Sequence, residues 1–227
     1  MTDRISHYLR IGSKDGKLSG TDTYRETCPI CKIFGCLSLQ SRCQFSDFYA
    51  QEAAHRPSVE RRDGVGIDRY TGGASRGALF DMSVAVGGKY TGTIRLRNFE
   101  VWHLGLIAFV LRDLKEGRLT FGTASSRGLG QMRGELLDAS IRVFSPDAAP
   151  GKIVGLGILT GTAWSAYGFA SLPAEKEGIP AGVPPTDDGM GIGQTYEYKG
   201  DEQVLSLLRA AAPVWGEYIR ARAAGGN

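Results

Sequence analysis

The sequence has few of the residues and motifs that mark common enzyme classes. Histidine occurs only 3 times in 227 residues, and the zinc-protease motif H-E-x-x-H is absent. The glycine loop at residues 122–130 matches neither the Walker A spacing nor G-x-G-x-x-G, so nucleotide binding of those classes is not supported. RNA cleavage by in-line attack of a 2′-hydroxyl needs no such motif, so a ribonuclease is not excluded.

Net charge and long apolar runs are also scarce. The 27 Lys and Arg residues exceed the 24 Asp and Glu residues by only +3, so any basic surface must be local. No run of 18 apolar residues occurs, and the start MTDRISHYLR lacks the apolar core of a signal peptide. We therefore expect a cytoplasmic protein with no membrane partner.

Cysteine is confined to one short segment, CPICKIFGCLSLQSRC. The first two cysteines form a C-x-x-C, and thiolates at these spacings can surround a tetrahedral Zn²⁺. A reducing cytoplasm favours metal over disulfides. We therefore expect a structural zinc site, in which His55 or His7 would be able to replace either later cysteine. The alternative is that the later cysteines are small core residues. The predicted ligands are Cys28, Cys31, Cys36 and Cys43.

The first hundred residues predict mainly β structure. Residues 1–27 are polar, with HYLRI as a possible strand, and CQFSDFY predicts a short strand from Cys43. The charged residues 52–63 have no clear period. The runs ALFDMSVAV and KYTGTIRLR are rich in β-formers and flank Gly87 and Gly88, which predicts a hairpin.

Residues 98–117 predict a helix with Asn98 as its N-cap and Gly117 at its end. Its nearly continuous apolar body predicts that a sheet covers most of it, with His103 in the core rather than acting as a base. A glycine loop follows, and then a strand at the end of QMRGELLDASIRVF. Hairpin, helix, loop and strand in this order predict an α+β fold of the ferredoxin-like type.

The last third predicts an irregular appendage. Residues 145–200 are rich in Gly and Pro, and DEQVLSLLRAAAPVWGEYIRAR predicts a terminal helix that Pro213 kinks or splits. The expected organisation is therefore a core at 1–144, containing the cysteine cluster 28–43, and an appendage at 145–227 packed on it.

Two glycine-rich segments carry the candidate chemistry, GVGIDRYTGGASRGALFD at 64–81 and GTASSRGLG at 122–130. Guanidinium groups, hydroxyls and exposed backbone N–H groups suit phosphates, and a tyrosine can stack on a base. Alone, the first segment is better explained as a surface loop with an Asp68–Arg69 or Arg76–Asp81 pair. A plain helix-to-strand connection explains the glycines of the second segment equally well, although it does not require its Ser-Ser-Arg. Beside a ferredoxin-like sheet, RNA binding explains both. The candidate residues are Arg69, Tyr70, Arg76, Gly122, Ser125, Ser126, Arg127 and Gly128.

Three segments together resemble the RAMP superfamily backbone subunits of type III CRISPR effector complexes: CPICKIFG, GVGIDRYTGGASRGALFDMSVAVGGKYTG and LRDLKEGRLTFGTASSRGLGQMRG. The resemblance spans about residues 28–144. It implies a modified RNA-recognition fold with a thumb-like insertion, with residues 67–80 at the base of the thumb and the loop around Arg127 on the guide backbone. It also implies that cysteines or a histidine near the C-x-x-C hold structural zinc.

The function implied by this resemblance is a guide-RNA-binding backbone subunit in antiviral defence. Its partners would be guide RNA, complementary target RNA and other effector subunits, including copies of itself. Two alternatives remain, an endoribonuclease subunit that cleaves guide-paired target RNA with Mg²⁺ and a stand-alone zinc-containing RNA-processing enzyme.

The catalytic residues stay unassigned. Relatives carry a longer region before the cysteine motif, including an aspartate associated with target cleavage, whereas 27 residues precede Cys28 here. None of Asp3, Asp15 and Asp22 aligns with that aspartate. We expect an N-terminus that is short or supplied by another chain, which would expose a sheet edge to a neighbour.

Overall fold

The structure is a computed structural model that describes residues 20–144, 150–159, 178–187, 189, 191 and 193–224. Contacts within the chain divide these residues into two compact units. One unit contains the described residues up to Arg42 and from Leu96 onward, and the other is Cys43–Arg95. The predicted strand at HYLRI lies outside the described residues.

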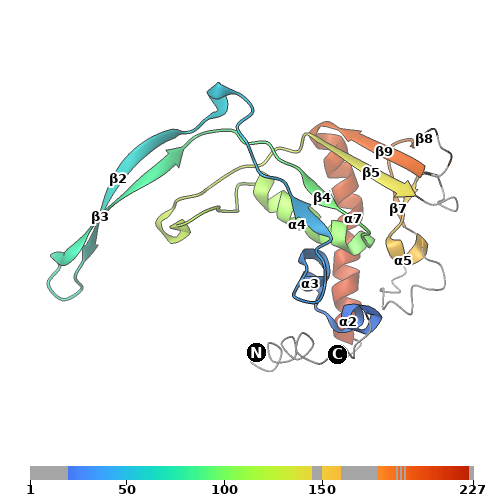
Figure 1. Cartoon of the computed structure of the whole chain (residues 1–227), viewed down its shortest axis with the longest axis horizontal. Coiled ribbons are helices and arrows are strands. Elements are labelled where there is room, and N and C mark those ends of the chain that lie inside the picture. The colour runs from blue at the N-terminus through green and yellow to red at the C-terminus, as the bar shows by residue number, and fades with distance from the viewer. Residues whose placement is uncertain are drawn as a thin grey trace. The chain divides into compact units, whose positions relative to one another are not determined.

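The smaller unit is built from short strands and one long hairpin (Figure 1). Its elements are β1 (Cys43–Phe45), the 3-10 turn η1 (Ala53–His55), β2 (Ser58–Ile67), β3 (Ala74–Val86) and β4 (Ile94–Leu96). β2 pairs with β3 in an antiparallel sheet, and β1 pairs with β4. The predicted strand at Cys43 is confirmed.

The hairpin predicted across Gly87 and Gly88 is wrong. β3 pairs with the segment before it, and the chain after the two glycines returns toward β1, because Lys89 N–H donates to the His55 carbonyl at 2.8 Å and Thr91 pairs with Tyr49. β2 showed no period in the sequence because its first six residues are all exposed. A strand without a buried face needs no apolar alternation.

The packing of the hairpin requires a residue without a side chain at Gly64. Gly64 lies opposite Phe80 across β2 and β3, and a Cβ at position 64 would lie 2.3 Å from the Phe80 ring. The pairing shifts by a bulge between Val65 and Ile67 before the turn. The ring of Phe80 therefore takes the place of a side chain on the neighbouring strand.

The larger unit combines helices with small antiparallel sheets, which confirms the α+β class. β5 (Asp138–Phe144), β9 (Gly193–Lys199) and β8 (Thr186–Asp187) form one sheet in that order, and β6 (Lys152–Ile153) pairs with β7 (Ile179–Pro180). The predicted strand at β5 is confirmed, whereas β9 lies in the segment expected to be an irregular excursion. The elements are α2 (Gly20–Glu26), α3 (Pro29–Phe34), α4 (Val101–Lys115), η2 (Ser125–Arg127), β5 (Asp138–Phe144), β6 (Lys152–Ile153), α5 (Leu156–Leu159), β7 (Ile179–Pro180), β8 (Thr186–Asp187), β9 (Gly193–Lys199) and α7 (Gly200–Ala224).

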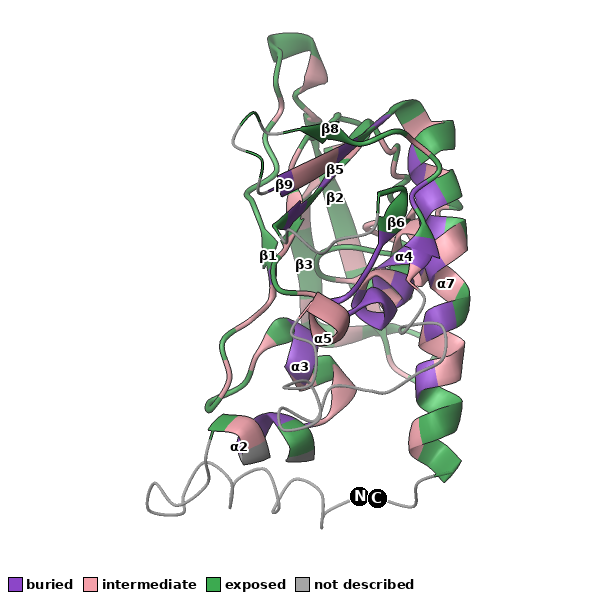
Figure 2. Cartoon of the chain, turned by 90° about the vertical axis from the view of Figure 1, so that its right-hand side faces the viewer, coloured by how far each residue is buried: buried purple, intermediate pink, exposed green. Residues whose placement is uncertain are grey.

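The core of this unit lies between α4 and α7, so the main partner of α4 is a helix and not the predicted sheet (Figure 2). Gly105 allows the close approach, because a Cβ there would lie 2.6 Å from the Ala211 carbonyl oxygen. Trp102 stacks on Tyr218 with ring centroids 4.0 Å apart. The buried residues of α7 recur at helical spacing: Val204, Leu207, Leu208, Ala211, Val214 and Tyr218.

Pro213 does not split α7, which continues as one helix from Gly200 to Ala224. A proline inside a helix removes one backbone hydrogen bond. Here Ala211 and Val214 on either side are 0% and 2% exposed, and their burial opposes a break in the helix.

The N-terminus of α4 is capped by Glu100 rather than by Asn98. The Glu100 backbone N–H donates to His103 Nδ1 at 2.9 Å, and the Glu100 carboxylate accepts from the His103 backbone N–H. The carboxylate also accepts from the Tyr24 hydroxyl at 2.7 Å and from Trp102 Nε1 at 3.0 Å. This reciprocal cap joins α2 to the start of α4.

The cap predicts how stability depends on pH. His103 is fully buried, as the sequence predicted, and burial holds its pKa well below the usual 6.5. Below pH 6.5 the unfolded chain binds a proton that the folded chain does not. The free energy of unfolding therefore decreases as the pH is lowered. In His103→Gln the amide oxygen would still accept from Glu100 N–H without titrating. We expect the wild type to lose about 2 kcal/mol more than this variant between pH 7 and pH 5 in denaturant unfolding. Equal losses in both proteins would contradict this account.

Candidate nucleic-acid interface

The turn between β2 and β3 is held by the carboxylate of Asp68. Its Oδ1 accepts from the backbone N–H groups of Tyr70 at 2.9 Å and Thr71 at 2.8 Å, and from the Thr71 hydroxyl at 3.0 Å. These donors, Thr71 first, lower the pKa of Asp68. Gly72 adopts a left-handed φ of 67°, which completes the turn. The I-D-R-x-T-G segment is therefore a turn motif in which Asp68 is committed to the backbone.

The position of this segment differs from the expectation. Residues 67–80 were expected at the base of a thumb, and the structure places residues 68–73 at the turn that ends the β2–β3 hairpin (Figure 1). The backbone closes there, because Asp68 N–H donates to the Gly73 carbonyl at 2.9 Å. Arg69 therefore lies within the turn itself, and Arg76 lies near the start of β3.

Ion pairs hold the arginines of β2 against neighbouring carboxylates. Arg61 Nη2 lies 3.2 Å from the Asp81 carboxylate, and Arg61 Nε lies 3.7 Å from that of Asp63. Asp63 and Asp81 are cross-strand partners, so Arg61 offsets a repulsion between like charges. Arg62 lies 3.4 Å from Glu60. This part of the hairpin is therefore close to neutral.

The turn end of the hairpin keeps its positive charge. Arg69 and Arg76 are exposed, and neither forms an ion pair within the described part of the chain. Tyr70 between them is 100% exposed. Because Asp68 is occupied by backbone donors, the end of the hairpin offers two guanidinium groups and an aromatic ring.

The second predicted segment forms a closed loop in the larger unit. Phe121 N–H donates to the Gly130 carbonyl at 2.8 Å, and Gly130 has a left-handed φ of 82°. Any Cβ at position 130 would lie 2.0 Å from the Phe121 carbonyl oxygen. The glycine is therefore required for the closure.

Side chains rather than amides are the exposed groups of this loop. The N–H groups of Arg127 and Gly128 donate to Ala124 and Ser125 at 2.9 and 3.0 Å within the turn η2. The expected array of exposed backbone donors is therefore reduced. Ser125, Ser126 and Arg127 remain exposed.

The basic residues around the loop are mostly paired. Arg112 lies 2.8 Å from Asp113, and Arg118 lies 2.6 Å from Glu116. Arg133 is exposed and forms no ion pair among the residues that the structure describes. Arg133 was not among the residues predicted from the sequence, although its place three residues after the S-R-G-L-G signature was a usable signal.

Three of the four cysteines interact at α3. Cys28 is the N-cap, and its Sγ accepts from the Cys31 N–H at 3.3 Å. Burial first, and then the thiols of Cys28 and Cys36, raise the pKa of Cys31 to about 11. Cys43 is 4% exposed and begins β1. Within the described residues no three His, Cys, Asp or Glu side chains are grouped to hold a metal ion.

One of the two histidines named as replacement ligands, His55, lies beside a carboxylate of the smaller unit. His55 Nε2 lies 3.9 Å from the Glu52 carboxylate, and His7 lies outside the described residues. The zinc site stays a prediction.

The profile of the RAMP superfamily matches residues 5–133, more than half of the chain. The chain belongs to the RAMP superfamily. Membership identifies a CRISPR-associated RNA-binding protein with a ferredoxin-like fold, and both glycine-rich segments lie in the matched range. A search of curated protein sequences finds no significant match. Among the described residues of this RAMP protein, no helix has the length and apolar character to span a membrane.

Proposed function

We propose that this RAMP protein is a guide-RNA-binding backbone subunit of a type III CRISPR ribonucleoprotein complex in antiviral defence. It contacts the sugar-phosphate backbone of the guide independently of sequence. Its further partners are complementary target RNA, other effector subunits and copies of itself, in the cytoplasm.

The observation that carries the proposal is the distribution of charge along the hairpin. The arginines on β2 are paired with carboxylates, whereas Arg69 and Arg76 at the turn are not. An exposed guanidinium without a carboxylate loses little when it binds a phosphate, because no ion pair has to be broken. The exposed ring of Tyr70 adds a surface on which any base can stack.

The glycine loop provides a second support in the other unit. It presents two hydroxyls and one guanidinium on a turn that a backbone hydrogen bond closes. Hydroxyls and guanidinium groups bind phosphate without reading base edges, which fits a subunit that must accept any guide sequence.

The hairpin arginines predict a defined loss of RNA binding. In Arg69→Gln/Arg76→Gln, affinity for single-stranded RNA should fall, and the slope of log K against log[salt] should become shallower by about 0.7 per lost phosphate contact. Arg62→Gln is the matched control, because that arginine lies on the same hairpin and is paired with Glu60. Fluorescence anisotropy over a range of salt concentrations measures both quantities. An equal loss of RNA affinity in Arg62→Gln would contradict the proposal that the turn arginines contribute more than a paired arginine of the same hairpin.

The glycine loop predicts a loss that is uniform across sequences. Arg127→Ala should weaken binding by a similar factor for several RNAs of equal length and unrelated sequence, because a phosphate contact carries no sequence information. The same anisotropy assay measures this. A loss of affinity confined to certain RNA sequences would indicate that Arg127 recognises bases rather than phosphates.

We also propose that the cysteine cluster holds a structural zinc ion. The short spacing of Cys28, Cys31 and Cys36 in the sequence supports this, since thiolates are preferred zinc ligands. Cys31→Ser should reduce the zinc content per chain in metal analysis and lower the melting temperature of the zinc-loaded protein. The control is Ser38→Ala, a hydroxyl in the same segment. Equal metal content in wild type and Cys31→Ser would favour the alternative of buried structural cysteines.

A further inference from the structure

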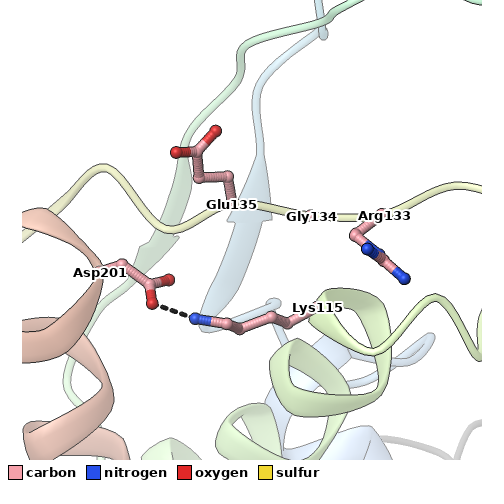
Figure 3. A pocket seen from close by; sticks show the side chains of 5 residues that line it. All are labelled: Lys115, Arg133, Gly134, Glu135 and Asp201. Carbon is pink, nitrogen blue, oxygen red and sulfur yellow. Dashed lines mark hydrogen bonds and ion pairs between the residues drawn. The ribbon is translucent and has the colours of Figure 1, made fainter.

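A pocket of about 470 Å³ lies where the end of α4 meets the start of α7 (Figure 3). It is lined by Lys115, Arg133, Gly134, Glu135 and Asp201. All five residues belong to the larger unit. None of them is among the residues assigned above to the hairpin or the glycine loop.

The backbone of this pocket is fixed by the packing of its lining segment. Gly134 N–H donates to the Leu114 carbonyl at 3.0 Å, and a Cβ at position 134 would lie 2.6 Å from the Leu114 side chain. Gln131 Nε2 donates to the Gly117 carbonyl at 3.3 Å. The segment that carries Arg133 and Glu135 is therefore held against the end of α4 before any ligand binds.

Two of the four charged side chains form an ion pair with each other, and the other two are exposed. Lys115 donates to the Asp201 carboxylate and thereby connects α4 with α7 (Figure 3). Arg133 and Glu135 flank Gly134, and their side chains diverge on either side of it (Figure 3). The pocket thus offers one guanidinium for an anion and one carboxylate for a hydrogen-bond donor.

This charge pattern selects among anions. The two cations and two anions of the lining cancel, so the pocket has no net positive charge to favour a free phosphate dianion. A phosphodiester carries a single charge, and its neighbouring ribose supplies a hydroxyl donor. A volume of about 470 Å³ is within the range of pockets that hold small ligands, so a nucleotide fits.

The segment that lines the pocket continues directly from the glycine loop. Thr120 pairs with Gln131, so the two arms of the loop run side by side from its closure down to Gly117 and Arg133. A Cβ at position 117 would lie 3.8 Å from Arg133 Nε. Only six residues separate Arg127 from Arg133, which limits their Cα separation to about 20 Å. A strand bound at the loop therefore reaches the pocket within a few nucleotides.

We propose that this pocket binds one ribonucleotide of the RNA, with the Arg133 guanidinium on a phosphodiester and the Glu135 carboxylate accepting from the ribose 2′-hydroxyl. The inference rests on the proposed RNA-binding function and adds a site that distinguishes RNA from DNA. The 2′-hydroxyl is the fitting donor because every ribonucleotide has one, whereas a base amine would impose a sequence preference.

The test compares single-stranded RNA and DNA of the same sequence with the full chain. Arg133→Gln should weaken RNA and DNA binding alike, by about five- to tenfold, because it removes a charged phosphate contact. Glu135→Ala should weaken RNA binding and leave DNA binding unchanged or stronger, so the preference for RNA falls. Arg118→Gln is the control, since that arginine is paired with Glu116 outside the pocket and should leave both affinities unchanged.

Two results would overturn the inference: RNA binding by Arg133→Gln equal to the wild type, or equal RNA and DNA losses in Glu135→Ala. Competition by millimolar inorganic phosphate would also contradict it, because the pocket would then be a plain anion site. Failure of the proposed function looks different, since the wild-type chain itself would bind no RNA. Melting temperatures equal to that of the wild type are the criterion that these surface changes leave the fold intact.

Discussion

Glu100 is a carboxylate with 1% exposure that accepts hydrogen bonds from three different side-chain and backbone donors at the start of α4. A buried carboxylate is tolerated only when its oxygens are satisfied and cations lie nearby. Lys32 and Arg42 supply that charge over the Tyr24 ring, with the Lys32 Nζ 4.7 Å and the Arg42 guanidinium 4.6 Å from its centroid. Burial and Arg222 lower the pKa of Lys32 to about 8, because a buried ammonium group loses hydration by water.

The consequences of this cap extend to the cysteine segment and to the pocket. Tyr24 belongs to α2 and Lys32 to α3, so the carboxylate fixes the segment that carries the first cysteines against α4. The same α4 packs on α7 through Trp102 and Gly105, and its other end meets the start of α7 through Lys115 and Asp201. The glycine loop and the pocket are therefore positioned by a helix that is fixed at both ends.

The sequence predicted elements with strong local signals and missed those that depend on distant partners. The apolar run and Gly117 located α4 well, and the burial of His103 followed from its place in that run. The N-cap was predicted two residues early, because the pairing of Glu100 with His103 and Tyr24 is not a local propensity. The hairpin was assigned to the wrong strands since β2 has no buried face and therefore no alternation to read.

The candidate site shows the same division. The motifs located both arginine-bearing segments. Nothing in the sequence indicated that the Asp68 carboxylate would accept hydrogen bonds from the turn backbone instead of pairing with Arg69. Which arginines are neutralised depends on strand register, as the pairing of Arg61 with Asp63 and Asp81 shows. Arg133 emerged only once the packing of Gly134 on Leu114 placed it in the pocket.

The central claim is that exposed cations at the hairpin turn and at the glycine loop bind the backbone of RNA. The most direct measurement is the nucleic acid that accompanies the protein when it is purified at low salt from cells that express a guide RNA. The account predicts a raised ratio of absorbance at 260 to 280 nm, a single short RNA length on a gel, and release of that RNA by high salt. Protein free of RNA that also fails to bind added single-stranded RNA at low salt would contradict the account.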